Sequence, residues 1–481
     1  MAPSLAQPPL DREEAPAPAA PALEAALESA LLQLPVDAFA ALSQELEQAS
    51  LDSGFTWERR DGGYDSVPLQ LRPRVWTTRQ CEFVRHACLT VQGALARLLP
   101  AWLDDAAVRE VLTLAPYEED RVRALARSGA DLRDQNLFAR LDAIIDTTSP
   151  TWDRTLAFLE PNVVGVGGVR YTALGEQLWE KVVRPRLGNA PILPPLDSRQ
   201  LMLEHLQDRA RALRLGGPLR VALIEDLRDT FGTNELRLIA EYFRSHGAQA
   251  HHVDVRTLEW DGNQLLAAGH PVDLVYRFTE LRELEELDDG KVLNPLWHAF
   301  DANRVVSTLA GDFDHKSTFE LFTSARFASH FTDAERRVFA RHVLWTRLVK
   351  ERRTDGPDGD ELDLAPFVRR HRAELVLKPN RSYGGQGVVI GAEVNDETWG
   401  ARLQEALAQP GGWVVQRFRP LPRQAFPVRR GDGWEHEELL VVCGFFATLR
   451  GVTAMGRASR AAVVNLTQRG ASLVPHVRID G

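Results

Sequence analysis

The chain has 481 residues, of which 44% are hydrophobic and 26% are charged, and its formal net charge is −10. This balance predicts a soluble protein of several domains and excludes a general nucleic-acid binder, because phosphate backbones require a basic surface. Three cysteines are too few for a disulfide framework, and no apolar run is long enough to span a bilayer. We therefore expect a cytoplasmic protein with no membrane or nucleic-acid partner.

The first part of the chain is predicted to be a disordered tail followed by helices. Residues 1–22 are rich in Ala and Pro and lack the basic start and apolar stretch of a signal peptide. Leucines and alanines then recur at helical spacing over 23–51. A proline-punctuated extended segment follows at 64–75, and further helices are expected at 78–99 and 118–128.

Two short strands with polar faces are predicted at 138–146 and 156–162. Because side chains alternate along a strand, the residues that share one face are Arg140 and Asp142 on the first strand and Phe158, Glu160 and Asn162 on the second. Two carboxylates and an amide oxygen are hard ligands suited to Mg²⁺, which often shares its remaining positions with substrate phosphates. By themselves these residues equally allow an exposed polar strand face.

Two further basic residues follow turn or helix-start patterns. The glycine-rich turn 165–168 leads to Arg170 and is expected to meet a substrate. Asp314 is a candidate N-cap, and Lys316 follows it in the first turn of a predicted helix. A positive charge there opposes the helix dipole unless an anion is bound, although a solvated surface lysine is the alternative.

The middle of the chain alternates between strands and helices. We predict a strand at 219–224, a helix at 234–245, a strand at 248–255, a hairpin at 258–267 and a strand at 272–278. This alternation is typical of a small α/β unit with a parallel sheet.

The segment 375–390 runs from an apolar strand through a glycine-rich loop into a second strand. Lys378 lies at the end of the first strand, and glycines in the loop let backbone amides approach a phosphate. A hairpin with a glycine-rich turn is the alternative for this segment alone. Residues 413–418 then form a strand suited to a flat apolar ligand such as adenine, and 439–465 are predicted to form a β meander.

The order of these segments resembles that of the circularly permuted ATP-grasp proteins, whose relatives include the synthetase domain of glutathionylspermidine synthase. Glu160 and Asn162 match the metal pair of that family, and they precede Lys378 by more than two hundred residues, as the permuted arrangement requires. The resemblance implies a mixed α/β ATP-grasp fold that is circularly permuted and has a helical N-terminal region.

The resemblance also implies how the chain is divided. Residues 23–200 would contain the helical region and the segment with the metal ligands. Residues 201–310 would form an inserted, small Rossmann-like pre-ATP-grasp domain, and 311–481 the nucleotide-binding subdomains.

The same resemblance implies site residues for ATP and Mg²⁺. The nucleotide would be bound by Lys316, Lys378, Ser382, Gly384, Gly385, Gly387, Gln416, Arg417 and Phe418. The metal ligands would be Asp142, Glu160 and Asn162, and the phosphoryl charge would be neutralised by Arg140 and Arg457.

The function implied is an ATP-dependent ligase that joins a small-molecule or peptide carboxylate to an amine through an acyl phosphate. Pro161 stands between two of the metal ligands and removes an amide donor there. The Thr/Pro-rich continuation of the glutathionylspermidine-type enzymes is also missing, so that substrate is not transferred. A catalytically weak nucleotide-binding scaffold and an ATP-dependent phosphotransferase are the alternatives, and the sequence identifies neither the substrates nor the oligomeric state.

Overall fold

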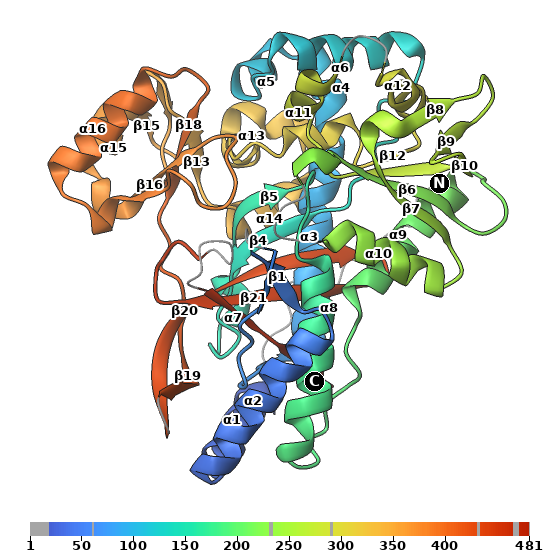
Figure 1. Ribbon diagram of the computed structural model, residues 1–481. Coiled ribbons are helices and arrows are strands. Elements are labelled where there is room, and N and C mark those ends of the chain that lie inside the picture. Colours follow the sequence, from blue (N-terminus) through green and yellow to red (C-terminus); the bar gives the residue numbers. More distant parts are fainter. Residues whose placement is uncertain are drawn as a thin grey trace.

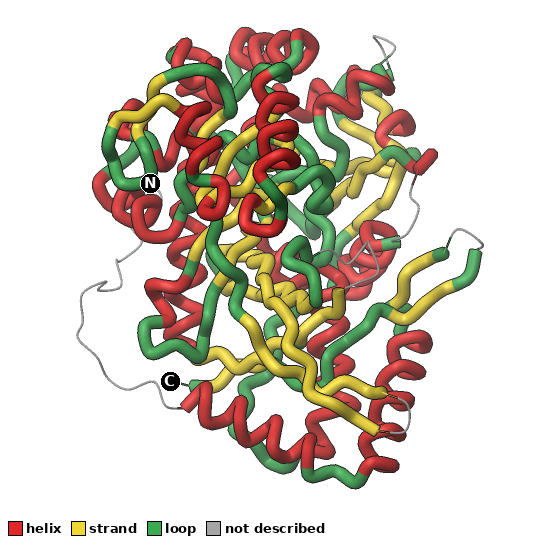
Figure 2. Tube along the Cα trace, turned by 90° about the vertical axis from the view of Figure 1, so that its left-hand side faces the viewer, coloured by secondary structure: helices red, strands yellow, loops and turns green. Residues whose placement is uncertain are grey.

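The computed structural model describes residues 19–59, 62–229, 234–288, 292–430, 433–464 and 471–480. Helices and several separate sheets make up these residues, which confirms the mixed α/β class. Figure 1 shows the chain from the N-terminal helices in blue to the C-terminal strands in red. Figure 2, turned by 90°, shows strands passing through the middle of the molecule, with helices above and below them.

The N-terminal part of the described chain is mainly helical, as predicted. Its elements are α1 (Ala19–Leu32), α2 (Val36–Asp52), β1 (Thr56–Glu58), β2 (Tyr64–Ser66), β3 (Arg74–Thr77), α3 (Thr78–Ala96), α4 (Leu98–Asp104), α5 (Ala106–Val111) and α6 (Pro116–Ser128). Helix α1 begins inside the predicted tail. Helix α3 begins at a capping box, in which Thr77 and Gln80 each satisfy the other's backbone N–H.

The central sheet is antiparallel and joins segments from distant parts of the chain. Its strands in order are β22 (Ala471–Val474), β21 (Gly451–Ser459), β20 (Gly433–Thr448), β4 (Arg140–Ile144) and β5 (Ala157–Asn162), and β19 (Arg423–Arg430) also pairs with β20. The two predicted polar strands therefore lie side by side as β4 and β5. The meander is confirmed for β20 and β21, but its third described strand is β22, and residue 465 lies outside the described part.

A β-bulge interrupts the pairing of β4 with β5. Asp142 faces Glu160 across the ladder, whereas the residue after Asp142 faces Phe158. Leu159 is therefore the additional residue of the bulge. As a result Phe158 is fully buried in the core, whereas Glu160 and Asn162 are half-buried. The prediction that all three share one face is wrong for Phe158, because simple alternation does not anticipate a bulge.

The parallel sheet forms the small α/β unit expected from the sequence. Its strands in order are β12 (Val305–Val306), β11 (Leu274–Arg277), β6 (Arg220–Glu225) and β7 (Gln249–Asp254). The helices around it are α9 (Ser198–Ala212), α10 (Glu235–Ser245), α11 (Leu281–Leu287) and α12 (Asn294–Asp301), and a small sheet contains β8 (Leu258–Trp260), β9 (Leu265–Ala267) and β10 (His270–Val272). Ligands of such sheets bind beyond the carboxyl ends of the strands.

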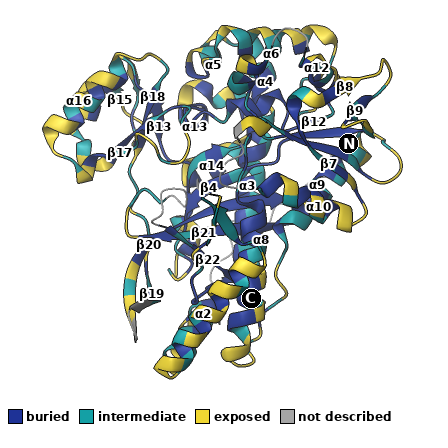
Figure 3. Cartoon of the chain, in the orientation of Figure 1, coloured by how far each residue is buried: buried dark blue, intermediate teal, exposed yellow. Residues whose placement is uncertain are grey.

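A second four-stranded sheet, here called the outer sheet, stands at the upper left of Figure 1. Its antiparallel strands in order are β13 (Thr346–Leu348), β18 (Trp413–Arg417), β16 (Leu375–Pro379) and β17 (Val389–Ile390). It is accompanied by β14 (Arg353–Asp355), β15 (Glu361–Asp363), α15 (Leu364–Arg370) and α16 (Asp396–Leu407). The pairing of β16 with β17 confirms the predicted strand, loop and strand. Figure 3 shows that α16 is largely exposed on its outer side.

The remaining elements connect these sheets. They are α7 (Trp152–Thr155), α8 (Val169–Leu178), α13 (Thr318–Thr323), α14 (Asp333–His342) and β23 (His476–Ile479), which pairs in parallel with β3. Among the described residues, no single helix is long and apolar enough to cross a membrane, although α1 and α2 would meet that test as a pair bent by 108°.

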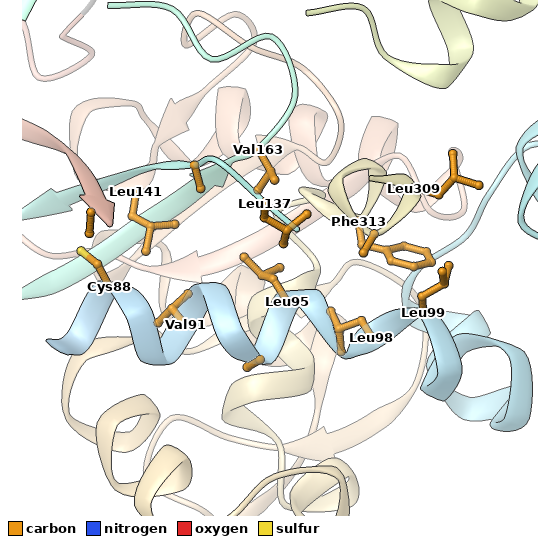
Figure 4. Close-up of a cluster of buried hydrophobic side chains, with 14 of the residues drawn as sticks. Cys88, Val91, Leu95, Leu98, Leu99, Leu137, Leu141, Val163, Leu309 and Phe313 are labelled. Atoms are coloured by element: carbon orange, nitrogen blue, oxygen red, sulfur yellow. The ribbon is translucent and has the colours of Figure 1, made fainter. Parts of the chain in front are cut away.

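Helix α3 packs beneath the strands that contain the polar residues. Figure 4 shows Val91 and Leu95 of α3 pointing toward Leu137, Leu141 and Val163. All five side chains are buried. Each large aliphatic side chain buried in this way contributes about 1.5–3 kcal/mol. The apolar core therefore fixes the backbone of β4 and the end of β5 from one side, while the polar side chains face the other.

A buried ion pair links the parallel sheet to the segment before α13. Arg277 pairs with Asp312, and both side chains are almost fully buried. The guanidinium also donates to the carbonyl oxygens of Ser307 (2.6 Å), Thr308 (2.9 Å) and Thr279 (3.1 Å). Its removal would leave several buried acceptors without donors.

We expect Arg277→Met to lower the free energy of unfolding by about 3–5 kcal/mol, because it leaves a buried carboxylate unpaired. Urea denaturation followed by circular dichroism measures the loss. The matched control is Arg353→Met. Arg353 forms an ion pair with Glu361 in which both side chains are exposed, so its replacement should lower the free energy of unfolding by less than about 1 kcal/mol. Equal losses in the two variants would contradict this account of the buried pair.

Candidate functional site

One cavity of about 970 Å³ lies where the central, parallel and outer sheets meet. All the predicted site residues except Gly387 line it: Arg140, Asp142, Glu160, Asn162, Lys316, Lys378, Ser382, Gly384, Gly385, Gln416, Arg417, Phe418 and Arg457. They come from β4, β5, β16, β18, β21, the loop after β16 and the segment before α13. The fold thus brings together residues that are far apart in the sequence, while their binding roles stay predictions.

Asp142 is held between two arginines. Its Oδ1 accepts a hydrogen bond from Arg140 Nε and its Oδ2 accepts one from Arg457 Nη2, both at 2.8 Å. Burial by itself raises the pKa of Asp142, but the two guanidinium groups outweigh burial and hold the pKa below its usual range. The carboxylate is therefore charged at neutral pH, and it aligns two cationic groups at the edge of the cavity.

Gly444 makes room for this arrangement. It lies on β20 directly opposite Asp142, and a Cβ at this position would come within 2.6 Å of Arg140 Cδ and 2.8 Å of Asp142 Oδ1. Such distances are too short for any side chain to be accommodated without a shift. Gly444 is not among the predicted site residues, although a glycine inside a predicted strand is a signal of close approach.

Glu160 and Asn162 are the more accessible members of the predicted metal set. Glu160 Oε2 lies 3.4 Å from Lys316 Nζ, and the amide nitrogen of Asn162 donates to the carbonyl oxygen of Arg140 at 3.2 Å. This hydrogen bond directs the amide nitrogen of Asn162 to the protein backbone. Among the described residues, no group of three His, Cys, Asp or Glu side chains is placed to hold a metal ion.

These contacts fit Mg²⁺ only in part. Glu160 and Asn162 offer the hard oxygen donors that Mg²⁺ prefers, and substrate phosphates and waters usually complete its coordination. The oxygens of Asp142, by contrast, are both engaged by arginines. Glu160 and Asn162 therefore stay predicted ligands, whereas both oxygens of Asp142 are already engaged in aligning Arg140 and Arg457.

Lys378 is buried between the outer sheet and β5. Its Nζ donates to Gln416 Oε1 at 2.7 Å and lies 3.5 Å from the carbonyl oxygen of Leu159. Burial is the main reason that the pKa of Lys378 falls to about 8, and Lys316 lowers it further, whereas the charge of Glu160 opposes the shift. The amine is thus a cation that is only partly compensated by protein groups.

Lys316 anchors the base of the glycine-rich loop. Its Nζ donates to the carbonyl oxygen of Ser382 at 2.5 Å. Its backbone N–H donates to the carbonyl oxygen of Asn380 at 3.1 Å. Next to these residues, Arg381 Nη1 donates to the fully buried carboxylate of Glu118 at 2.7 Å. The start of the loop is therefore held firmly by the body of the molecule.

The remainder of the glycine-rich loop is exposed. Tyr383 has 63% of its surface accessible, although it is a large hydrophobic residue. Gly387 does not line the cavity, and it adopts a left-handed φ of 72° at a point where a Cβ would approach Pro379 Cγ to 2.8 Å. Its conformation makes the turn back into β17, so its predicted contact with the nucleotide stays untested.

Arg417 and Phe418 line the cavity from the end of β18. Arg417 is exposed and its guanidinium lies 3.7 Å from the carboxylate of Asp358. The backbone N–H of Phe418 donates to the carbonyl oxygen of Glu374 at 2.7 Å. This N–H is therefore engaged, whereas the Phe418 side chain contributes an apolar surface to the cavity.

The wall formed by the parallel sheet and its neighbours is mainly acidic, although Arg228 also lines it and pairs with Asp226, and Arg282 pairs with Glu280. The acidic residues there are Glu225, Asp226, Glu235, Glu280, Glu283, Glu286 and Asp314. Burial and then the nearby charge of Asp314 raise the pKa of Glu280 to about 8. Burial also raises the pKa of Asp314, to about 6. This wall was not predicted from the sequence, because its residues are adjacent only in the fold.

Three smaller predictions are corrected here. Asp314 is not an N-cap: α13 begins at Thr318, and the Asp314 carboxylate accepts hydrogen bonds from the N–H groups of Val163 and Val164. Lys316 consequently lies before the helix, so the dipole argument does not apply to it. Arg170 does not face the cavity, because its guanidinium donates to the carbonyl oxygens that follow α2.

We expect Gly444→Ala to lower the rate of any reaction at the site by at least about tenfold, because the added methyl group must displace Arg140 and Asp142. Steady-state turnover and the melting temperature are measured together. Gly400→Ala is the matched control, because a Cβ at that helical position meets open space and the change should be neutral or slightly stabilising. Full activity in Gly444→Ala would show that the two arginines need no such room.

The chain is similar in fold to solved structures. No family model matches the chain, and no curated protein does so. Among solved structures, a glutathione synthetase-like effector (GSS30) from Globodera pallida, in its apo form, aligns over 92% of this chain and 98% of its own, with a TM-score of 0.63 and 12% sequence identity. The chain therefore has the fold of a glutathione synthetase-like protein.

Proposed function

We propose that the protein is an ATP-dependent carboxylate–amine ligase with a circularly permuted ATP-grasp fold. The observation that carries the proposal is that a single cavity gathers Lys316 and Lys378 with the arginines and carboxylates of the central sheet. The outer sheet, with its glycine-rich loop, would cover the nucleotide, and β5, which precedes it in the chain, would provide the metal ligands. The likeness to a glutathione synthetase-like protein supports this assignment at the level of the fold.

The chemistry requires charge neutralisation more than a nucleophilic side chain. A carboxylate oxygen attacks the γ-phosphorus of ATP, the bond to the ADP oxygen breaks, and an acyl phosphate forms. The amine nitrogen then attacks the acyl carbon, gives up a proton and releases inorganic phosphate. Lys316, Lys378, Arg140 and Arg457 would stabilise the negative charge that moves onto the phosphoryl oxygens.

A divalent cation would be held by Glu160 and Asn162. When bound, Mg²⁺ would neutralise charge on the ATP phosphates and orient them for in-line transfer. Asp142 would keep Arg140 and Arg457 aligned at the same edge of the cavity, since its two oxygens are already shared between them.

The acidic wall gives the amine substrate a place to bind. An amine is cationic at neutral pH, and carboxylates near it favour the charged form. Its pKa of about 8 leaves Glu280 partly deprotonated at neutral pH, and that fraction would accept the proton that the attacking nitrogen releases. Within one cavity, the basic residues would thus bind the nucleotide and the acidic wall would bind the amine substrate.

A nucleotide-binding scaffold is the second candidate. The observation that favours it is that Lys316 and Lys378 both already donate to protein oxygens, those of Ser382 and Gln416. ATP binding without turnover over a panel of amines would support the scaffold. A stable phosphorylated product formed without an amine would instead indicate a phosphotransferase.

We expect Lys378→Ala and Glu160→Gln each to lower ATP turnover by at least about a hundredfold, because each removes a group that balances phosphoryl or metal charge. ADP release is measured with Mg²⁺ and with panels of carboxylates and amines. Lys350→Ala is the control, since Lys350 does not line the cavity and its nearest carboxylate is 4.0 Å away. Retained turnover in both site variants would place the active site elsewhere.

ATP affinity should depend on pH through Lys378. Only the protonated amine attracts phosphate, so affinity is expected to fall as the pH rises through about 8, the pKa of this buried lysine. Lys378→Arg should remove the part of this dependence that Lys378 causes, because a guanidinium stays protonated, and any remainder would come from Glu280, which titrates in the same range. Calorimetric titration with ATP between pH 6.5 and 9 measures the difference, and identical profiles for the two proteins would contradict it.

A further inference from the structure

Gln416 sits at the centre of a hydrogen-bond chain that crosses the outer sheet. It lies on β18, is 1% exposed, and is paired in register with Thr346 on β13 and with Val376 on β16. Its Nε2 donates to Thr346 Oγ1 at 2.9 Å and to the carbonyl oxygen of Leu159 at 3.1 Å. Its Oε1 accepts from Lys378 Nζ at 2.7 Å. All polar atoms of this side chain are therefore used.

The orientation of the amide is determined by its acceptors. Thr346 Oγ1 donates its own proton to the carbonyl oxygen of Leu344 at 2.9 Å, so toward Gln416 it acts as an acceptor. The second acceptor, the carbonyl oxygen of Leu159, cannot donate. Both N–H groups of Gln416 are thus directed at these two oxygens, and the amide oxygen faces Lys378.

The bulge in β5 supplies the third part of the arrangement. Leu159 is the additional residue of that bulge, and its carbonyl oxygen receives the hydrogen bond from Gln416 and lies near Lys378 Nζ. The next residue is Glu160, one of the two accessible metal ligands. A side chain of the outer sheet is therefore joined to the backbone beside that ligand.

We propose that Gln416 is a positioning residue, which aims the Lys378 amine at the nucleotide phosphates and ties the outer sheet to β5, and does not recognise the adenine base. This inference rests on the proposed ATP binding and replaces the sequence-based role of Gln416 in the adenine pocket. The chain from Thr346 through Gln416 to Lys378 acts as a unit. Loss of the Gln416 amide releases the lysine, and loss of the Thr346 hydroxyl weakens the hold on the amide and so has part of this effect.

The test compares ligands with and without phosphates. Gln416→Met keeps the size of the side chain but removes its hydrogen bonds, and binding of ATP, GTP, inorganic triphosphate and adenosine is measured by calorimetry. We expect affinity for the three phosphate ligands to fall at least about tenfold, with the ATP-to-GTP ratio and adenosine binding unchanged. An equal loss for adenosine, or a changed ATP-to-GTP ratio, would overturn the proposal.

A double-mutant cycle tests the connection to the lysine. In a Lys378→Met background, Gln416→Met should cause no further loss of triphosphate affinity, and additive losses would overturn the proposal. Thr346→Val should reproduce the Gln416→Met effect in part, whereas Thr346→Ser keeps the hydroxyl and should restore wild-type affinity. These milder variants keep the test decisive if Gln416→Met does not fold.

The ligase and the positioning role fail differently. Suppose that the protein binds ATP and the double-mutant cycle gives the expected result, but no ADP is released with any carboxylate and amine. This outcome would contradict the ligase function and would support the role of Gln416. Normal ligase turnover together with unchanged triphosphate affinity in folded Gln416→Met would support the ligase function and contradict the role of Gln416.

Discussion

The bulge at Leu159 is the constraint on which the rest of the site depends. Because of the bulge, the side chain of Phe158 lies in the apolar core while that of Glu160 faces the cavity. One short strand therefore contributes to both the core and the cavity. It also frees a carbonyl oxygen that Gln416 and Lys378 reach from another sheet. In a regular strand Phe158 and Glu160 would lie on the same face, because side chains alternate. Either Phe158 would then leave the core or Glu160 would leave the cavity.

The carboxylates around the cavity differ in how far neighbouring cations neutralise them. Asp142 is fully satisfied by two arginines, Glu160 is close to one lysine, and Glu280 pairs with Arg282 near the carboxylate of Asp314. The first arrangement is rigid, because hydrogen bonds to a charged group are strong and directional. Glu160 is half-buried on the same sheet, so its charge is left for a ligand to balance, whereas Glu280 is already paired with an arginine.

Sequence reasoning predicted the parts of this protein that depend on local pattern. The alternating segments of the parallel sheet, the pairing of β16 with β17 and the two polar strands were predicted with nearly correct bounds. The order of Glu160, Lys316 and Lys378 in the sequence also led to residues that share one cavity. The bulge could not be predicted because it depends on how two strands pair. The acidic wall and the ion pair of Asp142 with Arg457, 315 positions later in the chain, depend on contacts between distant segments.

The outer sheet enters and leaves the rest of the molecule through neighbouring strands. Thr346 on β13, where the chain enters, is paired with Gln416 on β18, where the chain departs. A segment whose two ends lie side by side can be inserted into an existing protein, or exchanged for another, without changing the path of the host chain. The outer sheet is thus a compact insertion, and its contacts with Leu159, Lys316 and Glu118 are the points that any replacement would have to match.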